Sequence, residues 1–367
     1  MIKFLDIHKI NNRFEEELKN EFHTFLNSGQ YILGDALKQF EAVYANYCGT
    51  DYCLGVSNGL DALTLIFNGF KTLGRLKAGD QVIVPANTYI ASVLSIINSG
   101  LEPVLVEPCE KTYNISATEL EKHITKKTKA VMAVHLYGQL ANMELIKDLA
   151  RKYNLIVIED AAQSHGAMDT NGNKAGNFSN AAAFSFYPTK NLGALGDAGA
   201  VTTNDEELYK IIKKLRNYGS EKKYVSELVG FNNRMDELQA VFLNMKLKFL
   251  DVDNEARRRI AKRYLNEINN PKVLLPFYKG ARNHVFHLFV VRVEKRDAFL
   301  EHLKKCGVQA LVHYPVSPHK QKALIEFVSL KLPITEAIHD TVVSLPISPV
   351  MTNEEVDAVI KSVNTYN

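Results

Sequence analysis

The stretch Leu155-Ile-Val-Ile-Glu-Asp160 is a short apolar run that ends in two acids. Its four consecutive apolar residues predict a strand buried on both faces of a sheet. Ligands of open parallel sheets bind beyond the carboxyl ends of the strands, so Asp160 stands where a ligand would bind. The stretch Ser185-Phe-Tyr-Pro-Thr-Lys190 ends a second apolar run, in which Pro188 interrupts the strand.

Similar runs recur through the first ~250 residues, with amphipathic stretches between them. The other predicted strands are Val82–Val84, Val104–Val106, Val131–Val134, Ala182–Phe186 and Ala200–Thr202. Two stretches have helical spacing, one through Phe14, Leu18, Phe22 and Phe25 and one through Leu37, Phe40, Tyr44 and Tyr47. This alternation predicts an α/β fold with a mixed, mostly parallel central sheet flanked by helices.

The last third of the chain has a different pattern. It contains predicted helices over Met235–Phe249, Glu255–Asn266, Asp297–Lys305 and Glu354–Val363, and a predicted strand over His284–Val293. Pro271 and Pro276 break the pattern between them. We therefore expect a large sheet domain over residues 1–250 and a smaller α+β domain over residues 251–367, both of ordinary domain size.

Composition excludes several classes of protein. Apolar residues make up 46% and charged residues 23% of the chain, which is typical of globular proteins. The net charge of +3 argues against a nucleic-acid partner. The first ten residues lack the apolar core of a signal peptide, and the uncharged run Gln81–Leu101 is too polar to span a membrane. The four cysteines form no disulfide framework, so we expect a cytoplasmic protein.

The glycines exclude two common nucleotide sites. No two of the 20 glycines are separated by a single residue, so the dinucleotide fingerprint G-x-G-x-x-G is absent. The pairs Gly29/Gly34 and Gly74/Gly79 have the P-loop gap, but aspartate follows each pair where the P-loop needs lysine. Such a sheet needs another cofactor or none.

Pyridoxal phosphate is one cofactor whose needs the chain meets. It requires a lysine for its covalent link and a carboxylate that keeps the pyridine nitrogen protonated, which Lys190 and Asp160 can supply. It also requires a phosphate cradle, and the turn before a predicted helix at Gly59 and Leu60 offers free backbone amides. Tyr89 can stack on the ring. Taken singly, each residue has an ordinary structural explanation: a solvated charge, a helix capped by Ser57 or Asn58, or a packed ring.

Together these residues resemble the sugar aminotransferases of the DegT/DnrJ/EryC1 family. The shared motifs, in order along the chain, are Gly29-Gln-Tyr-Ile-Leu-Gly34, S-N-G-L-D-A-L from Ser57, P-A-N-T-Y from Pro85, E-D-A-A-Q-S-H-G from Glu159, S-F-Y-P-T-K-N-L-G from Ser185, Gly230–Ala240 and His313-Tyr-Pro. The resemblance covers nearly the whole chain. It implies a fold of the fold-type-I aspartate-aminotransferase kind and pyridoxal 5′-phosphate as cofactor.

The resemblance also implies a role for each matching residue. Lys190 would carry the covalent link and then act as general base, and Asp160 would pair with the pyridinium nitrogen. The other implied cofactor contacts are Gln163 near the ring and its 3-hydroxyl, Tyr89 on the ring face, and Ser185, Gly59, Leu60 and Asn232 at the phosphate. Asn232 would come from the neighbouring subunit, so a homodimer with shared active sites is implied. Two positions depart from the family: Leu60 replaces a common Thr, and Gly196-Asp-Ala198 replaces a common Gly-Glu-Gly.

The motif around Lys190 is most similar to members that aminate C3 of a nucleotide-linked 3-keto-6-deoxyhexose, with L-glutamate as the usual amino donor. The alternative is amination at C4 of a dTDP- or UDP-4-keto-6-deoxyhexose. A hydroxyl-rich sugar would pair with Tyr187, Tyr218, His313 and Tyr314, and a pyrophosphate with Arg234. Members with histidine in place of the lysine act as dehydratases, and Lys190 argues against that activity.

Two rival functions and two further motifs complete the expectations. The rivals are a non-catalytic regulator that binds pyridoxal phosphate and a nicotinamide oxidoreductase with an atypical loop. His284 and His287 lie on opposite faces of their predicted strand, so no metal site is expected. Arg257-Arg-Arg259 is interpreted as a solvated helix face.

Overall fold

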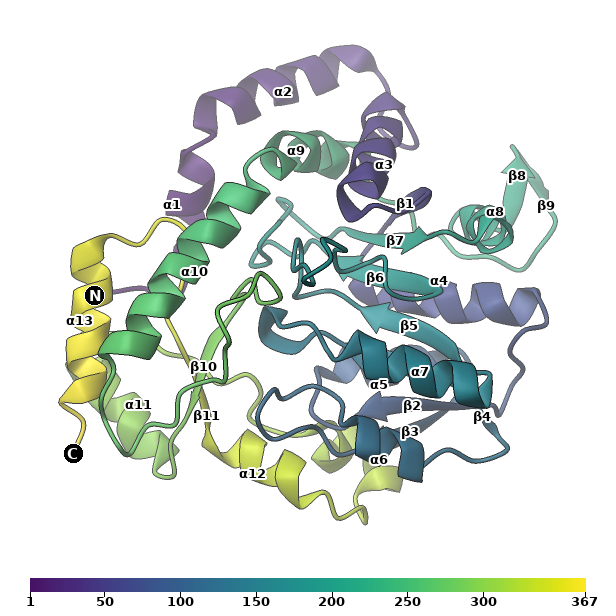
Figure 1. Cartoon of the computed structure of the whole chain (residues 1–367). Helices are drawn as coiled ribbons and strands as arrows, with labels where there is room; N and C mark the ends of the chain where they lie inside the picture. Colours follow the sequence, from purple (N-terminus) through teal and green to yellow (C-terminus); the bar gives the residue numbers. More distant parts are fainter.

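A computed structural model describes all residues, 1–367. A seven-stranded sheet forms its centre, in the order β1-β7-β6-β5-β4-β2-β3 (Figure 1). The strands are β1 (Tyr52–Val56), β2 (Gln81–Pro85), β3 (Glu102–Val106), β4 (Thr128–Val134), β5 (Ile156–Asp160), β6 (Ala181–Ser185) and β7 (Gly199–Thr203). Only β7 runs antiparallel to its neighbours. The six predicted strands and the mixed, mostly parallel sheet are therefore confirmed.

Sequence patterning missed β1, because Gly55 interrupts its apolar run. A Cβ at Gly55 would lie 2.5 Å from Leu37 Cδ1. The glycine thus lets helix α3 (Asp35–Cys48) pack directly on the strand. The glycine that interrupts the apolar run in the sequence therefore also permits the close packing of β1 against α3.

Helices cover both faces of the sheet. One face packs against α4 (Gly59–Thr72), α5 (Ile90–Asn98) and α8 (Glu206–Leu215), and the other against α6 (Ala117–Lys122) and α7 (Met143–Tyr153). Strand β4 shows the division clearly. Its residues Ala130, Met132 and Val134 join the first core, whereas Val131 and Ala133 join the second. Helices α3 and α9 (Glu237–Leu247) enclose a further core beside β1, β6 and β7.

The N-terminal helices α1 (Ile7–Asn12) and α2 (Glu15–Ser28) lie outside this body, and α2 runs along α9 (Figure 1). The predicted helix through Phe22 is confirmed, yet α2 has no buried residue. Phe22 is 41% and Leu26 48% exposed. This chain alone therefore leaves the apolar face of α2 uncovered.

The remaining elements build a smaller unit. They are α10 (Leu250–Glu267), β10 (Phe289–Arg292), α11 (Arg296–Lys305), α12 (Pro333–Thr341), β11 (Val342–Leu345) and α13 (Asn353–Asn364). Residues on β10 face two cores: Val290 packs towards the large sheet, while Phe289 and Val291 pack in the core of the smaller unit. The predicted division at residue 250 coincides with the start of α10, and the division into two domains stays a prediction.

Two predictions about this part are wrong. The strand expected over His284–Val293 is only β10, because Phe286 has a positive φ of 45° that an extended strand cannot contain. The alternation argument for His284 and His287 therefore fails. Both imidazoles are buried in separate contacts: His284 Nδ1 accepts from the Phe286 amide at 3.0 Å, and His287 Nδ1 lies 3.2 Å from Asn191 Oδ1.

The basic stretch Arg257-Arg-Arg259 is not a solvated face either. Arg257 and Arg258 are only 3% and 8% exposed. Arg257 donates to the Ile347 carbonyl at 2.9 Å, and burial lowers its pKa to about 10. Only Arg259 faces solvent. The buried guanidinium ties α10 to the loop that follows β11.

The N-terminal residues contact the smaller unit, although the two are far apart in the sequence. Ile2 pairs in parallel with Val308 and donates to the Gly307 carbonyl at 2.7 Å, and Gln309 donates back to Ile2 at 2.9 Å. The ring of Phe4 stacks on His313 at 5.5 Å. None of the helices has the length and apolar character that a membrane span requires.

Candidate active site

Asp160 is the last residue of β5 and is 9% exposed. Ser92 Oγ donates to its Oδ2 atom at 2.8 Å, and the Ala162 amide donates to its Oδ1 atom at 3.2 Å. Each carboxylate oxygen thus has one donor from the protein and keeps lone pairs for a ligand. The side chain is held in one orientation at the carboxyl end of the sheet.

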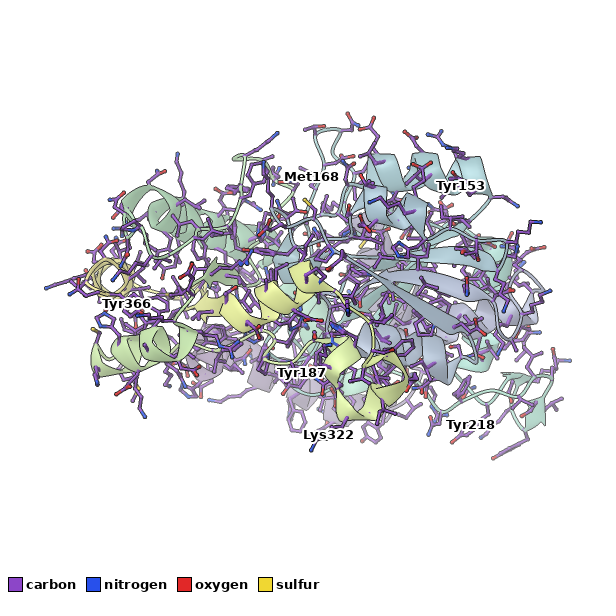
Figure 2. All side chains as sticks on the ribbon, turned by 90° about the horizontal axis from the view of Figure 1, so that it is seen from below. Tyr153, Met168, Tyr187, Tyr218, Lys322 and Tyr366 are labelled. Atoms are coloured by element: carbon purple, nitrogen blue, oxygen red, sulfur yellow. The ribbon has the colours of Figure 1, made fainter.

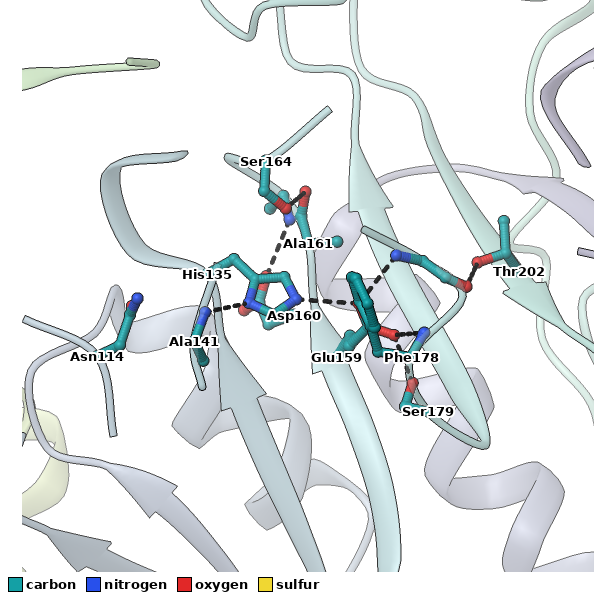
Figure 3. Close-up of polar contacts among 12 residues, drawn as sticks. Asn114, His135, Ala141, Glu159, Asp160, Ala161, Ser164, Phe178, Ser179 and Thr202 are labelled. Atoms are coloured by element: carbon teal, nitrogen blue, oxygen red, sulfur yellow. Dashed lines mark hydrogen bonds and ion pairs between the residues drawn. The ribbon is translucent and has the colours of Figure 1, made fainter. Parts of the chain in front are cut away.

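The preceding residue, Glu159, forms a separate buried network (Figure 3). It accepts from His135 Nε2 at 2.9 Å, from the Gly176 and Phe178 amides, and from Ser179 Oγ at 2.8 Å. Burial opposes its ionisation, but these contacts outweigh burial and lower its pKa. His135 Nδ1 accepts from the Ala141 amide, so its proton is on Nε2. Glu159 therefore anchors neighbouring loops, while Asp160 serves the site.

Lys190 lies in the loop after β6, where its amide donates to the Tyr187 carbonyl at 2.8 Å. Burial lowers the pKa of its amine to about 8, although the charge of Asp160 opposes this effect. The charge of Lys190 in turn contributes to the low pKa values of His165 (about 3) and His313 (about 4), whose main cause is burial. About half of the Lys190 amine is thus neutral and nucleophilic at pH 8, and about a tenth at pH 7.

The end of β1 leads into α4, whose first residues are Gly59 and Leu60. Asn58 caps the helix by accepting from the Asp61 amide at 2.9 Å, so the capped-helix interpretation is correct. The amides of Gly59 and Leu60 nevertheless have no partner within the helix. A Cβ at Gly59 would lie 2.8 Å from the Ser185 Cβ. The helix N-terminus and the end of β6 therefore meet closely enough to form one anion cradle.

A group of rings closes one side of the site. Tyr89 precedes α5, is 53% exposed and lies 5.1 Å from the Tyr314 ring. Gln163 joins these rings to the sheet: its Nε2 donates to Tyr314 Oη at 3.0 Å, and its Oε1 accepts from the Tyr137 amide at 2.6 Å. Tyr137 Oη donates to the His313 carbonyl at 2.6 Å. Four predicted site residues thus come together here.

Other predicted residues lie elsewhere on the chain. Arg234 donates to Asn217 Oδ1 at 2.9 Å and lies 5.4 Å from the Tyr218 ring. Figure 2 shows Tyr218 well away from Tyr187, so one chain does not gather all the predicted sugar contacts. Asn232 is exposed. Its neighbour Asn233 accepts from the Ser57 amide at 3.3 Å, so this segment passes beside the anion cradle of its own chain.

Sequence patterning missed the residues that support the site from behind. Ser92 and Tyr137 bond to Asp160 and Gln163, as described above. Asn191, next to Lys190, donates to Asn254 Oδ1 at 2.8 Å and to the Val285 carbonyl at 3.1 Å. No sequence spacing indicates these contacts, because Ser92, Tyr137 and Asn191 meet partners far away in the chain.

A groove with a volume of about 1080 Å³ lies between α3 and α8. None of the residues named above as cofactor or sugar contacts lines it. The candidate site is therefore defined by converging polar groups at the ends of β1, β5 and β6.

The chain is similar to known proteins in both sequence and structure. The chain is 54% identical over 366 residues to dTDP-3-amino-3,6-dideoxy-alpha-D-galactopyranose transaminase of Aneurinibacillus thermoaerophilus, covering 100% of this chain and 99% of that protein. The structure of S. venezuelae DesV, in complex with a ketimine intermediate, matches with a TM-score of 0.95 and 42% identity, over 99% of this chain and 97% of that one. The Bacillus subtilis ntda structure, with bound cofactor PMP, matches with a TM-score of 0.91 and 34% identity, over 98% and 83% of the two chains.

The model of the DegT/DnrJ/EryC1/StrS aminotransferase family matches residues 12–364. The match spans the sheet, the loop of Lys190 and the smaller unit. The close structural matches also confirm the predicted fold-type-I architecture. The chain therefore belongs to the DegT/DnrJ/EryC1/StrS aminotransferase family.

Proposed function

We propose that this protein aminates C3 of a dTDP-linked 3-keto-6-deoxyhexose, using pyridoxal 5′-phosphate and L-glutamate. The observation that carries the proposal is the approach of a lysine amine of pKa about 8 to the fixed carboxylate of Asp160, beside a free helix N-terminus. The name of the 54%-identical relative, a dTDP-3-amino sugar transaminase, supports the choice of C3.

The residues present fit the cofactor. The amides of Gly59 and Leu60 with Ser185 would hold its phosphate, and Gly59 leaves the space that a Cβ would fill. Asp160 would hold the proton on the pyridine nitrogen, and Gln163 has one amide proton left for the 3-oxygen of the ring. When bound, the cofactor supplies an electron sink for the carbanion formed at the substrate carbon.

Lys190 would perform the proton transfers. Its Nζ must be neutral to take a proton from the substrate carbon, and its lowered pKa makes this form available near pH 8. The same atom would return the proton at C4′ of the cofactor. The supporting contacts of Asn191 limit how far this loop can move while Lys190 acts.

Part of the sugar site would come from Tyr187, His313 and Tyr314. The low pKa of His313, which burial causes, keeps its imidazole neutral at physiological pH. A neutral imidazole can exchange hydrogen bonds with sugar hydroxyls without attracting an anion to that position. Gln163 fixes Tyr314 beside Tyr89, so the sugar would meet a rigid aromatic wall.

We propose that the complete site forms in a homodimer, with Asn232, Tyr218 and Arg234 acting on the partner. Exposed apolar groups support this proposal. Tyr224 is 91% and Val229 97% exposed on the segment around strands β8 (Ser220–Lys222) and β9 (Val225–Ser226).

We also propose a cytoplasmic location, which the four free thiols support.

The test is incubation of the purified protein with pyridoxal phosphate, L-glutamate and either a 3-keto or a 4-keto dTDP-6-deoxyhexose, followed by NMR of the product. An amine at C3 is expected. An amine at C4 would replace the proposal by its alternative. A protein that binds the cofactor but aminates neither sugar, with the UDP-linked sugars included, would support the regulator instead.

A further inference from the structure

Two buried hydroxyl groups connect α5 to the carboxylate of Asp160. Thr88 Oγ1 lies 2.8 Å from Ser92 Oγ, and Ser92 Oγ lies 2.8 Å from Asp160 Oδ2. Thr88 is 2% exposed and Ser92 is fully buried. Water therefore does not compete for these contacts, and the three polar groups must satisfy one another.

The direction of each hydrogen bond follows from the number of protons. An ionised carboxylate only accepts, so the single hydroxyl proton of Ser92 points to Asp160. Ser92 Oγ then has no proton left for Thr88 and must accept from Thr88 Oγ1. The chain runs Thr88 to Ser92 to Asp160. Each bond in such a chain polarises the next, which strengthens the final bond to the carboxylate.

We propose that Thr88 and Ser92 are positioning residues that aim the Asp160 carboxylate at the ring nitrogen of the cofactor. This inference rests on the proposed function, because it assumes that a pyridinium ring occupies the site. The Ala162 amide holds the other carboxylate oxygen at 3.2 Å. With one oxygen fixed by each donor, the plane of the carboxylate is set before the cofactor arrives.

The chain also couples two sides of the ring site. Tyr89, the residue proposed to stack on the ring, lies between Thr88 and α5 in the sequence. The Ser92 amide donates to the Tyr89 carbonyl at 3.2 Å. The same short turn thus positions the Tyr89 ring and, through Ser92, the Asp160 carboxylate. A change in the hydroxyl chain should therefore alter the positions of both groups.

The same helix provides a matched control. Ser95 is also fully buried, but its hydroxyl donates to the Ser92 carbonyl at 2.7 Å, within the helix. Loss of that hydroxyl removes a local helix contact and leaves Asp160 untouched. Ser92→Ala and Ser95→Ala therefore remove the same atom from the same helix, and only the first removes a contact to the site.

The experiment measures pyridoxal phosphate binding to the cofactor-free variants by absorbance titration. We expect Ser92→Ala to raise the dissociation constant about tenfold, equivalent to about 1.4 kcal/mol, which is close to the lower limit for a hydrogen bond to a charged group. Ser95→Ala should bind like the wild type. The pH midpoint of the bound-cofactor absorbance should shift in Ser92→Ala alone, because that absorbance reports the protonation of the ring system.

Thr88 provides the second arm. Thr88→Val removes the hydroxyl at nearly constant shape, and Thr88→Ser keeps it. We expect a twofold to fivefold weaker binding for Thr88→Val and wild-type binding for Thr88→Ser. Equal dissociation constants and pH midpoints for Ser92→Ala, Ser95→Ala and wild type would overturn the inference. A wild-type protein that binds no pyridoxal phosphate would instead overturn the proposed function.

Discussion

Predicted site residues lie in two regions, the ends of β5 and β6 and the segment 217–234. The two regions differ in how far their side chains are buried. At the strand ends, Asp160 and its donor Ser92 are buried and bonded to each other within the chain. On the segment, Asn232 and Tyr218 are exposed, and Tyr218 lies away from Tyr187. One region is complete in a single chain, whereas the other presents its side chains outward.

The difference separates two tasks. Cofactor chemistry needs fixed charges in a desolvated place, and the carboxyl ends of buried strands provide this without help. Contacts supplied to a neighbour must instead remain on the surface until the neighbour arrives. Substitutions at the strand ends should therefore impair cofactor chemistry within one chain. Substitutions on the segment 217–234 should instead impair the site of a neighbouring chain.

The largest effect is expected at Lys190. Lys190→Ala removes both the covalent link and the base, so turnover should fall by roughly 10⁴-fold and the lysine-linked cofactor absorbance should vanish. Absorbance and turnover are measured on the same preparation. Normal transamination by this variant would refute the role of Lys190.

Lys246→Met is the matched control for that variant. Lys246 is also buried with a pKa lowered by burial to about 8, but its amine donates to Asn11 Oδ1 at 2.9 Å and to the Gly193 carbonyl. Its loss should lower stability while the cofactor absorbance remains. If both variants lose the absorbance, buried charge and not the amine at position 190 is required.

A smaller effect is expected at Asp160, and it should contrast with that of its neighbour. Asp160→Asn removes the charge facing the ring nitrogen, so turnover should fall by roughly 10²–10³-fold with little change in Tm. Glu159→Gln should instead lower Tm with little change in turnover, because Glu159 accepts four hydrogen bonds in a fully buried network. Turnover and thermal unfolding of both variants distinguish these outcomes. A stable but inactive Glu159→Gln protein would contradict the separation of roles.

A tenfold effect is expected when Asn232 is truncated, and subunit mixing shows which chain it serves. Asn232→Ala should weaken cofactor phosphate binding about tenfold. In a random mixture with Lys190→Ala, half of the dimers are hybrids, and if Asn232 acts on the partner each hybrid contains one site with both residues intact. At a cofactor concentration that leaves Asn232→Ala mostly unloaded, about a quarter of the sites should therefore bind cofactor and turn over like the wild type. No recovery above the sum of the two parents would mean that Asn232 serves its own chain.

The smallest effect concerns pH. The amine of Lys190 must be neutral to capture the cofactor, and burial lowers its pKa to about 8. The neutral fraction falls as pH decreases through this value, so the capture rate should drop about fivefold from pH 8 to pH 7 and level off well above pH 8. Stopped-flow absorbance on the cofactor-free protein measures this rate. His313, with a pKa of about 4, cannot supply the transition. A midpoint near 10 would show that burial does not tune the amine.

The sequence predicted the six strands because each contains a short apolar run, and it placed Asp160 at a strand end because topology alone decides this. It missed β1, where Gly55 conceals the pattern. It extended β10 through Phe286, whose positive φ depends on tertiary packing. Local patterns carry no information of that kind.

The supporting contacts of the site were also beyond prediction. Ser92 and Asp160 are 68 residues apart, and Tyr137 and His313 are 176 apart. No periodicity relates such pairs, since they meet only after the strands have been ordered in the sheet. The same reason explains Arg257, whose carbonyl partner Ile347 is 90 residues away.

The pairing of Ile2 with Val308 has a consequence for synthesis in the cell. Residues 2–4 leave the ribosome about 305 residues before their partner, a delay of about 15–60 s at ordinary elongation rates of ~5–20 residues per second. During that interval the large sheet can assemble, but Val308 and His313, the partners of Ile2 and Phe4, have not yet been made. Residues 2–4 thus gain these contacts only after the chain has been made beyond residue 308, and Phe4 reaches His313 later still.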